Sequence, residues 1–261
     1  MKRKSSSVEK VLDLVRILRS DNGCAWDKKQ DHTSLKPYLL EEVYEVIDAL
    51  DKKDHKKLKE ELGDLFFQIL FHAEIADENN EFNFGDILDV LHKKMLRRHP
   101  HVFGQKKVHN VALLIKQWQD IKHKEKRYGS LLDSVPDCLP SLFFAHKIQE
   151  KAASIGFDWN TLTGVFEKVT EEIKELEKEI KRGKPTMKDS ISEEIGDLLF
   201  SLVNLTRHLN LNAELVLHTS IKKFMKRFCF VEKKAKESGK DIRGYSLEEL
   251  DEWWEESKGE R

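Results

Sequence analysis

The sequence predicts an all-α protein that carries one helical pattern twice. No segment of the 261 residues alternates convincingly between apolar and polar residues with the period of two that a half-buried strand shows. Charged residues make up 36% of the chain, against about 25% in a typical globular protein, while glycine and proline are scarce. Long helices with solvent-facing sides explain both features, and the chain is long enough for two domains of ordinary size.

The first half of the chain predicts four helices. The first begins with a capping box of Ser6 and Glu9, carries an apolar stripe and ends near Arg19. A loop with Gly23 and Trp26 follows, in which the tryptophan either plugs the end of a helix bundle or offers a face to a planar ligand. The further helices are expected from Leu39 to the linker at Lys52, at about Asp54–Asn79, and at about Phe84–Arg98, where Pro100 ends the last.

Acidic residues interrupt two of these helices where apolar residues dominate. Glu41, Glu42 and Glu45 stand three and four residues apart among leucine, valine and isoleucine, so they project from one helix face. Glu61 and Asp64 stand three apart at the head of the next apolar helix, which the short linker folds back antiparallel. Several carboxylates at one partly buried seam destabilise the fold by roughly several kcal/mol, unless a multivalent cation neutralises their charge.

The same acidic arrangement returns in the second half. Glu171, Glu172 and Glu175 repeat the first triplet, and Glu194 with Asp197 repeats the pair within the shared string Glu-Glu-any-Gly-Asp-Leu. A single triplet of this kind is typical of a solvated helix face, but duplication with matched partners indicates a site. Ligands that are all anionic oxygens favour a hard cation, so we expect Mg²⁺, for which Mn²⁺ could substitute.

The second half restarts after a polar, proline-containing linker. Asn110 is expected to cap a connecting helix through Trp118 and Lys122 before this linker. Gly156 and Trp159 then echo the loop of Gly23 and Trp26. Helices are expected at about Leu142–Ile155, Leu162–Lys181, Ser190–Leu209 and Ala213–Lys236, and from Ser246, whose capping box uses Glu249.

Composition excludes several classes of partner and site. Lys plus Arg is 46 and Asp plus Glu is 47, so the chain lacks the overall positive field that nucleic-acid binding favours. The three cysteines are isolated and lack metal or redox spacing, which favours a reducing compartment. No run reaches the length of a membrane span, and no apolar core follows the basic N-terminal residues. We therefore expect a cytoplasmic protein that binds neither nucleic acid nor membrane.

Five strings of the sequence together resemble one family. They are GCAWDKKQDHTSLKPYLLEEVYEVIDAL, EELGDLFFQILFHAEIA, RRHPHVFG, KIQEKAASIGFDW and EEIGDLLFSLVNLTRHL, and they cover both halves in order. As a set they closely resemble the full-length, tandem-domain MazG nucleoside triphosphate pyrophosphohydrolases, members of the all-α NTP pyrophosphatase superfamily. The resemblance implies two four-helix MazG-like units, at residues 1–109 and 139–261 with a connecting helix and linker at 110–138, and assembly as a homodimer.

The resemblance also implies an activity and a set of site residues. The activity is Mg²⁺-dependent hydrolysis of NTPs and dNTPs, standard or non-standard, to nucleoside monophosphate and pyrophosphate, in a role that cleans the nucleotide pool. The implied metal ligands are Glu172, Glu175, Glu194 and Asp197, with Glu171 beside them, and their first-unit counterparts are Glu41, Glu42, Glu45, Glu61 and Asp64. The implied substrate-binding residues are Lys122, Lys223, Arg227 and Trp254.

Two departures from the family pattern are visible. Ala25 stands where the family usually has proline, which changes only the stiffness of the loop. Ser190 stands where a lysine can precede the second acidic pair, which puts a basic contact from that position in doubt.

Physical chemistry supports the same mechanism and assigns a base. Phosphoryl transfer needs positioning and charge neutralisation, which carboxylate-held Mg²⁺ and basic residues on the departing pyrophosphate supply. A carboxylate that is not saturated by metal would activate the attacking water, and Glu171 is the candidate, together with Glu172 and Glu175 as the catalytic acids. We expect the second unit to carry most of the activity, because its acidic helix is more exposed and because Lys122 and Trp254 lack evident first-unit counterparts.

Two alternatives stay open on the sequence, and a third is disfavoured. The enzyme could be a specialised dUTP or dCTP pyrophosphatase. The chain could be a helical interaction module without activity, in which the acids are surface charge. A di-iron carboxylate bundle is disfavoured, since Asp64 and Asp197 stand where that design needs histidine.

Overall fold

Helices are the only regular secondary structure in the residues that the structure describes. The computed structural model describes residues 7–104, 110, 113–114, 118, 121, 129–182 and 187–259. The chain divides into two compact units, residues 1–122 and 123–261, which are treated separately below. The all-α prediction is confirmed, and the finer boundaries at 109 and 138 stay a prediction. Among these residues, no helix is both long and apolar enough to cross a membrane.

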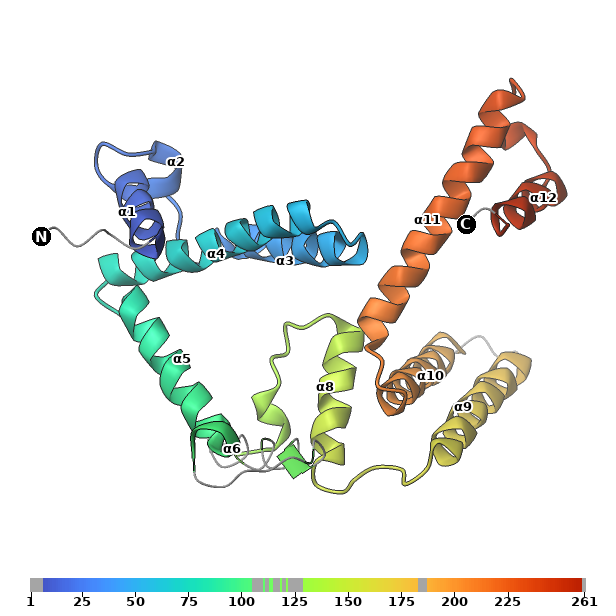
Figure 1. Cartoon of the computed structure of the whole chain (residues 1–261). Coiled ribbons are helices and arrows are strands. Elements are labelled where there is room, and N and C mark those ends of the chain that lie inside the picture. The colour runs from blue at the N-terminus through green and yellow to red at the C-terminus, as the bar shows by residue number, and fades with distance from the viewer. Residues whose placement is uncertain are drawn as a thin grey trace, which may run out of the picture. The chain divides into compact units, whose positions relative to one another are not determined.

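The first unit is organised by two long helices that lie side by side (Figure 1). They are α3 (Lys36–Asp51) and α4 (His55–Glu78). The turn between them is short because Lys53 adopts a left-handed backbone conformation, with φ 54°. Asp54 then caps α4 by accepting hydrogen bonds from two backbone N–H groups of its first turn. This turn makes the two helices antiparallel, so their acidic segments meet.

The other helices of the first unit pack on this pair through α1 (Ser7–Arg19) and α5 (Phe84–Arg98). The helix α1 packs on α4, the short α2 (Ala25–Lys28) contacts α1, and α5 contacts α4 before α6 (Pro100–Phe103). The buried core lies where α1 and the start of α3 meet the second half of α4, and it comprises Val15, Leu35, Leu70, Phe71 and Ile75. Phe66 and Phe84 join α4 to α5 with ring centroids 6.2 Å apart.

The second unit repeats the helix pair with α9 (Leu162–Arg182) and α10 (Met187–His208), which pack closely against each other. The helix α8 (Ser141–Ala153) packs on α10, as α1 packs on α4. The 25-residue α11 (Ala213–Glu237) leads away from the α9–α10 pair, and α12 (Leu247–Ser257) folds back against it (Figure 1). Two short 3-10 turns complete the unit, η1 (Leu132–Ser134) and η2 (Ile242–Gly244).

Most helices begin and end close to their predicted residues. The bounds of α5 agree fully with the prediction, and the capping box of Ser246 and Glu249 is present at α12. The four-residue helices α2 and α6 lie inside predicted loops, because four residues are too few to show helical periodicity. Ser6 and most of the predicted connecting helix from Asn110 to Lys122 lie outside the described residues.

Candidate functional site

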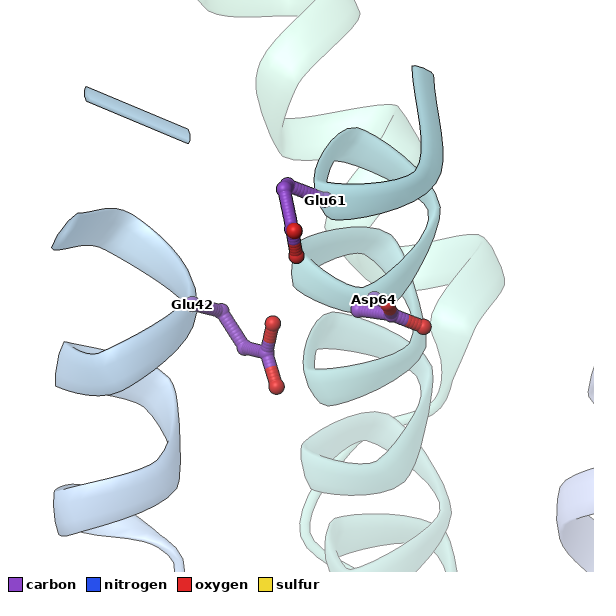
Figure 2. A group of neighbouring side chains, drawn as sticks. All are labelled: Glu42, Glu61 and Asp64. Carbon is purple, nitrogen blue, oxygen red and sulfur yellow. The ribbon is translucent and has the colours of Figure 1, made fainter. Parts of the chain in front are cut away.

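An acidic cluster lies at the seam of each helix pair. In the first unit, carboxylate oxygens of Glu42, Glu61 and Asp64 all lie within 4.8 Å of one another. Figure 2 shows Glu42 reaching from α3 toward α4, which carries Glu61 and Asp64. In the second unit, Glu172 on α9 forms the same set with Glu194 and Asp197 on α10. These are the two groups in the described residues that could hold a metal ion through three or more side chains.

The remaining predicted acids lie at the edges of these clusters. Glu45 hydrogen-bonds with Glu61, and this bond raises the pKa of the Glu45 carboxyl. Glu175 lies close enough to Glu194 to raise the pKa of that carboxyl. The carboxylate of Glu171 instead accepts a hydrogen bond from Lys168 at 3.0 Å. Glu41, the first-unit counterpart of Glu171, contributes through its charge to the raised pKa values of Glu42 and Glu45.

The clusters are electrostatically suited to a cation. Glu61 and Glu172 are only 6% and 4% exposed. Burial, followed by the charge of Asp64, raises the pKa of Glu42, and burial with the charges of Glu175 and Glu172 raises that of Glu194. The Oε2 atom of Glu42 is buried and has no hydrogen-bond partner among the described residues. Closely spaced carboxylates, one of them buried in each cluster, fit a divalent cation that prefers oxygen ligands, and the first cluster also has an unpaired oxygen.

One lysine partly neutralises each cluster, and the sequence reasoning missed both. In the first unit, Lys57 Nζ lies 3.4 Å from Glu61 Oε1. In the second unit, Lys168 Nζ lies 2.7 Å from Glu172 Oε1, and this hydrogen bond, with a second to Glu171, raises the pKa of Lys168. Both lysines stand four residues before a ligand acid, which is the spacing that could have identified them.

The two lysines come from different helices of their pairs. Lys57 is on α4, the second helix of the first pair, whereas Lys168 is on α9, the first helix of its pair. Aligning the acids of the two units places Tyr38 at the position of Lys168 and Ser190 at the position of Lys57. A basic contact to the second cluster therefore does not come from position 190, where Ser190 stands. It comes from Lys168 on α9, the other helix of the pair.

The predicted substrate-binding residues of the second unit gather on α11 and α12. The guanidinium carbon of Arg227 lies 5.7 Å from the ring centroid of Trp254, and the Phe224 ring lies 5.1 Å from it. Lys223 and Arg227 line a cavity of about 150 Å³ with Lys226, Phe230, Ser257 and Lys258. No described contact joins Lys223, Arg227 or Trp254 to the acidic cluster within the chain. Lys122 lies outside the described residues.

An open groove lies along α9, the helix that carries Glu172. Its volume is about 420 Å³, and Glu171 and Glu175 are among the residues that line it. Phe166, which is 59% exposed, lines the groove together with Thr163, Thr170 and Lys174.

The first unit contains an arginine–tryptophan pair of its own. The guanidinium carbon of Arg98 lies 5.9 Å from the ring centroid of Trp118. The prediction that Lys122 and Trp254 lack evident first-unit counterparts stays a prediction.

Comparison with known proteins identifies the family. The model of the MazG nucleotide pyrophosphohydrolase domain matches residues 30–103 and again residues 160–230. A nucleoside triphosphate pyrophosphohydrolase/pyrophosphatase MazG of Thermotoga maritima is 44% identical over 261 residues, which are 99% of this chain and 98% of that protein. The chain belongs to the MazG family.

Two further comparisons give the extent of the similarity. The nucleoside triphosphate pyrophosphohydrolase of Escherichia coli K12 is 41% identical over 257 residues, which are 97% of each chain. The crystal structure of a mazG-related protein from Thermotoga maritima is 28% identical and covers 44% of this chain and 98% of its own, with a TM-score of 0.39. The predicted MazG membership, the pyrophosphohydrolase class and the tandem arrangement of two MazG domains are confirmed. Each matched segment contains one complete acidic cluster.

Proposed function

We propose that this MazG protein hydrolyses nucleoside triphosphates, both NTPs and dNTPs, to monophosphate and pyrophosphate in a Mg²⁺-dependent reaction. The observation that carries the proposal is the convergence of Glu172, Glu194 and Asp197 across the α9–α10 seam. These three residues, with Glu175, would hold the cation, and the ion would neutralise phosphate charge when bound. Removing non-standard or surplus nucleotides from the cytoplasmic pool is the role that fits this reaction.

The residues of the chain divide the chemical work. Glu171 is our candidate for the base that accepts a proton from water as the water oxygen attacks the α-phosphorus. The bond from the α-phosphorus to the bridging oxygen then breaks, and the electron pair leaves with pyrophosphate. Lys223 and Arg227 on α11 are suited to grip the phosphates, and Trp254 is suited to pack against the nucleoside.

A homodimer is part of the same proposal. Within the described unit, α11 leads away from the acidic pair, so one chain does not bring its phosphate-binding residues onto its cluster (Figure 1). Ile195, Leu199 and Leu202 leave a half-exposed apolar stripe on α10. A contiguous apolar face of this kind is typical of a protein–protein interface, and a second copy would cover it.

The test of the function is a matched pair of double substitutions with product analysis. We expect Glu172→Gln with Glu175→Gln to lower pyrophosphate release at least about 100-fold, since two acids of the second site lose their charge. Glu42→Gln with Glu45→Gln should leave most of the activity. The assay covers a panel of NTPs and dNTPs with Mg²⁺, with Mn²⁺ and with chelator. Release of orthophosphate alone, or full activity in chelator, contradicts the proposal.

A preference for one nucleotide in that panel decides between general and specialised activity. Hydrolysis restricted to dUTP or dCTP would support the specialised pyrophosphatase. Reversal of the matched pair, with the first-unit substitutions abolishing turnover, would move the active site to the first unit.

A further inference from the structure

Two histidines join α4 to the chain segment that leads into α3. His72 lies on α4, and His32 lies in the segment between α2 and α3. Their Nδ1 atoms are 2.8 Å apart, their ring centroids are 5.1 Å apart, and the ring planes are within 7° of parallel. The two nitrogen atoms are closer than the roughly 3.5 Å that separates the faces of stacked rings. The rings therefore meet edge to edge in an N–H···N hydrogen bond.

The buried side of His72 determines which histidine donates this bond. The Nε2 atom of His72 and the Oε1 atom of Gln68, one turn earlier on α4, are buried and have no hydrogen-bond partner among the described residues. If His72 accepts at Nδ1, its proton is on Nε2, which is the donor that the oxygen of Gln68 lacks. If His72 donates, two unpaired acceptors remain buried one turn apart, which is the costlier arrangement. His72 is therefore the acceptor and His32 the donor.

The other edge of His32 determines its charge. Its Nε2 atom lies 4.0 Å from Oε2 of Glu81, which follows α4. A neutral His32 that donates from Nδ1 has a lone pair on Nε2, which a carboxylate repels, whereas an imidazolium has an N–H group there. The contact is thus a charge-assisted bond from a charged His32 to a neutral His72. Burial, followed by the charge of His32, lowers the pKa of His72, which agrees with a neutral ring at that position.

Other charged groups surround the pair on three elements. They are Asp31 next to His32, Glu74 and Glu78 on α4, Glu81 after α4, and Arg16 and Arg19 on α1, which pair with Glu74 and Glu78. A hydrogen bond from the backbone of Ser34 lowers the pKa of Asp31, so this carboxylate stays ionised in mild acid. Burial raises the pKa of Glu74, so this carboxyl is a second group that can take up a proton there.

The second unit responds to acid in the opposite direction. Leu205 stands at the position of His72 when the acidic pairs on α4 and α10 are aligned, so the histidine pair has no counterpart. A histidine of this unit, His208, has its Nε2 atom 2.9 Å from Oδ1 of Asp158. Protonation strengthens a contact between a histidine and a carboxylate, whereas it removes the acceptor from a contact between two histidines.

We propose that the His32–His72 pair is a proton-dependent fastener of the first unit. It holds residues 31–35 on α4 while one ring is neutral, and it releases them when both rings are protonated. Two imidazolium rings carry an N–H group at each Nδ1 atom, so the bond loses its acceptor and two positive charges face each other. The segment ends in Leu35, which is 2% exposed in the core and directly precedes α3. Mild acid therefore loosens the start of the helix that carries Glu42. This inference does not depend on the proposed function.

Hydrogen exchange of the full chain, followed by mass spectrometry and corrected for the intrinsic effect of pH, measures the opening of this segment. The backbone amides of Thr33, Ser34 and Leu35 donate hydrogen bonds within it and report its state. In the wild type, we expect the opening of residues 31–35 to increase at least about fivefold from about pH 6.5 to about pH 5. Residues 27–30 should change less than about twofold, because Arg19 binds the carbonyl oxygens of Asp27 and Gln30 throughout this range.

His32→Gln and His72→Gln each remove the titration of the pair. A glutamine amide can turn either its NH₂ group or its oxygen toward the remaining histidine, so the contact persists in both protonation states. Each variant should change less than about twofold over the same pH range. Glu74→Gln and His92→Gln are the controls, since one removes the other titrating group and the other removes an exposed histidine of α5. Both should keep the wild-type pH dependence.

The two glutamine substitutions lie on different elements, so if one variant does not fold, the other still tests the pair. Opening of residues 31–35 that is independent of pH in the wild type overturns the inference. A wild-type pH dependence that a folded glutamine variant retains, or that Glu74→Gln abolishes, overturns it as well.

Discussion

A single lysine offsets the charge of each acidic cluster. Lys168 contributes more than Lys57, because it donates to two carboxylates, and one of them belongs to the 4% exposed Glu172. An ion pair with one buried partner is more costly to break than a surface pair, since the remaining charge stays desolvated. The ammonium group of the lysine therefore supplies part of the positive charge that a bound metal ion would supply to the same carboxylates.

Replacement of Lys168 by methionine should destabilise the metal-free protein by roughly 1–2 kcal/mol, because Glu172 is left beside two other acids without a counter-charge. Saturating Mg²⁺ should reduce this loss. Thermal unfolding with and without Mg²⁺ measures both effects. Lys181→Met is the matched control, since it removes an exposed i,i+4 pair with Glu177 on the same helix and should cost about 0.5 kcal/mol or less. Equal losses for the two variants would exclude the counter-ion role of Lys168.

The raised pKa values of Glu42 and Glu194 predict how pH affects Mg²⁺ binding. Burial and neighbouring carboxylates raise each pKa above that of the unfolded chain. These groups therefore stabilise the metal-free fold at low pH, and that contribution is lost as pH rises through the raised pKa. Mg²⁺ binds the ionised forms, so protons compete with it at a higher pH than for ordinary glutamates.

At a fixed, sub-saturating Mg²⁺ concentration, the increase in the unfolding temperature caused by Mg²⁺ should grow between about pH 5 and pH 7. The combination of Glu42→Gln and Glu194→Gln should flatten this dependence, because neither amide titrates. Differential scanning calorimetry at several pH values measures the increase. A Mg²⁺ effect that is constant across this range contradicts the prediction.

At the scale of helices, an arginine fastens the loop before the acidic helix. Arg19 is 7% exposed and donates two hydrogen bonds to the carboxylate of Glu78, at 2.8 and 2.7 Å. It also donates to the carbonyl oxygens of Asp27 and Gln30, and it lies over the ring of Phe71. One side chain thus connects the end of α1 to the end of α4 and to the segment between α1 and α3, which includes α2 with Trp26.

Arg19→Lys should destabilise the protein by about 2–4 kcal/mol, because an ammonium group cannot replace a buried planar fork with four hydrogen bonds. Chemical denaturation measures the loss. The control is Arg16→Lys, one turn earlier on α1, where the arginine is about half exposed and pairs with Glu74 and Asp13; its cost should stay below about 1 kcal/mol. Similar costs for the two variants would show that Arg19 does not fasten the loop.

The sequence predicted the helices and the acidic clusters because both depend on local spacing. Glu61 and Asp64 share a face in any helix, and a short turn brings them to Glu42. The burial of Arg19 and the pairing of Arg98 with Trp118 could not be predicted. These contacts join segments that are distant in the sequence, and residue spacing does not determine how such segments pack. The buried, unpaired side-chain atoms of Gln68 and His72 could not be predicted either, because the burial of single atoms depends on tertiary packing.

At the scale of the whole molecule, the equivalent apolar stripes of the two units differ at their middle position. In the first unit, Phe66 of α4 is partly buried and contacts Phe84 of α5. Its counterpart in the second unit, Leu199, is 49% exposed, while the other two positions of the stripe are exposed to a similar extent in both units, as Leu62 and Ile69 on α4 and as Ile195 and Leu202 on α10. The second unit therefore exposes on α10 an apolar surface that a homodimer would bury.

Ile195→Asp with Leu199→Asp should convert the proposed homodimer into monomers, because two charges one turn apart would have to be desolvated at the interface. Sedimentation velocity should give the wild type about twice the 30.6 kDa mass of one chain and the variant a mass near that of one chain. Leu247→Asp, at a 77% exposed position at the start of α12, should leave the dimer intact. Pyrophosphate release should fall with dissociation, since within one chain Lys223 and Arg227 make no described contact with the acidic cluster. A wild-type protein that is monomeric and fully active would refute the dimer proposal.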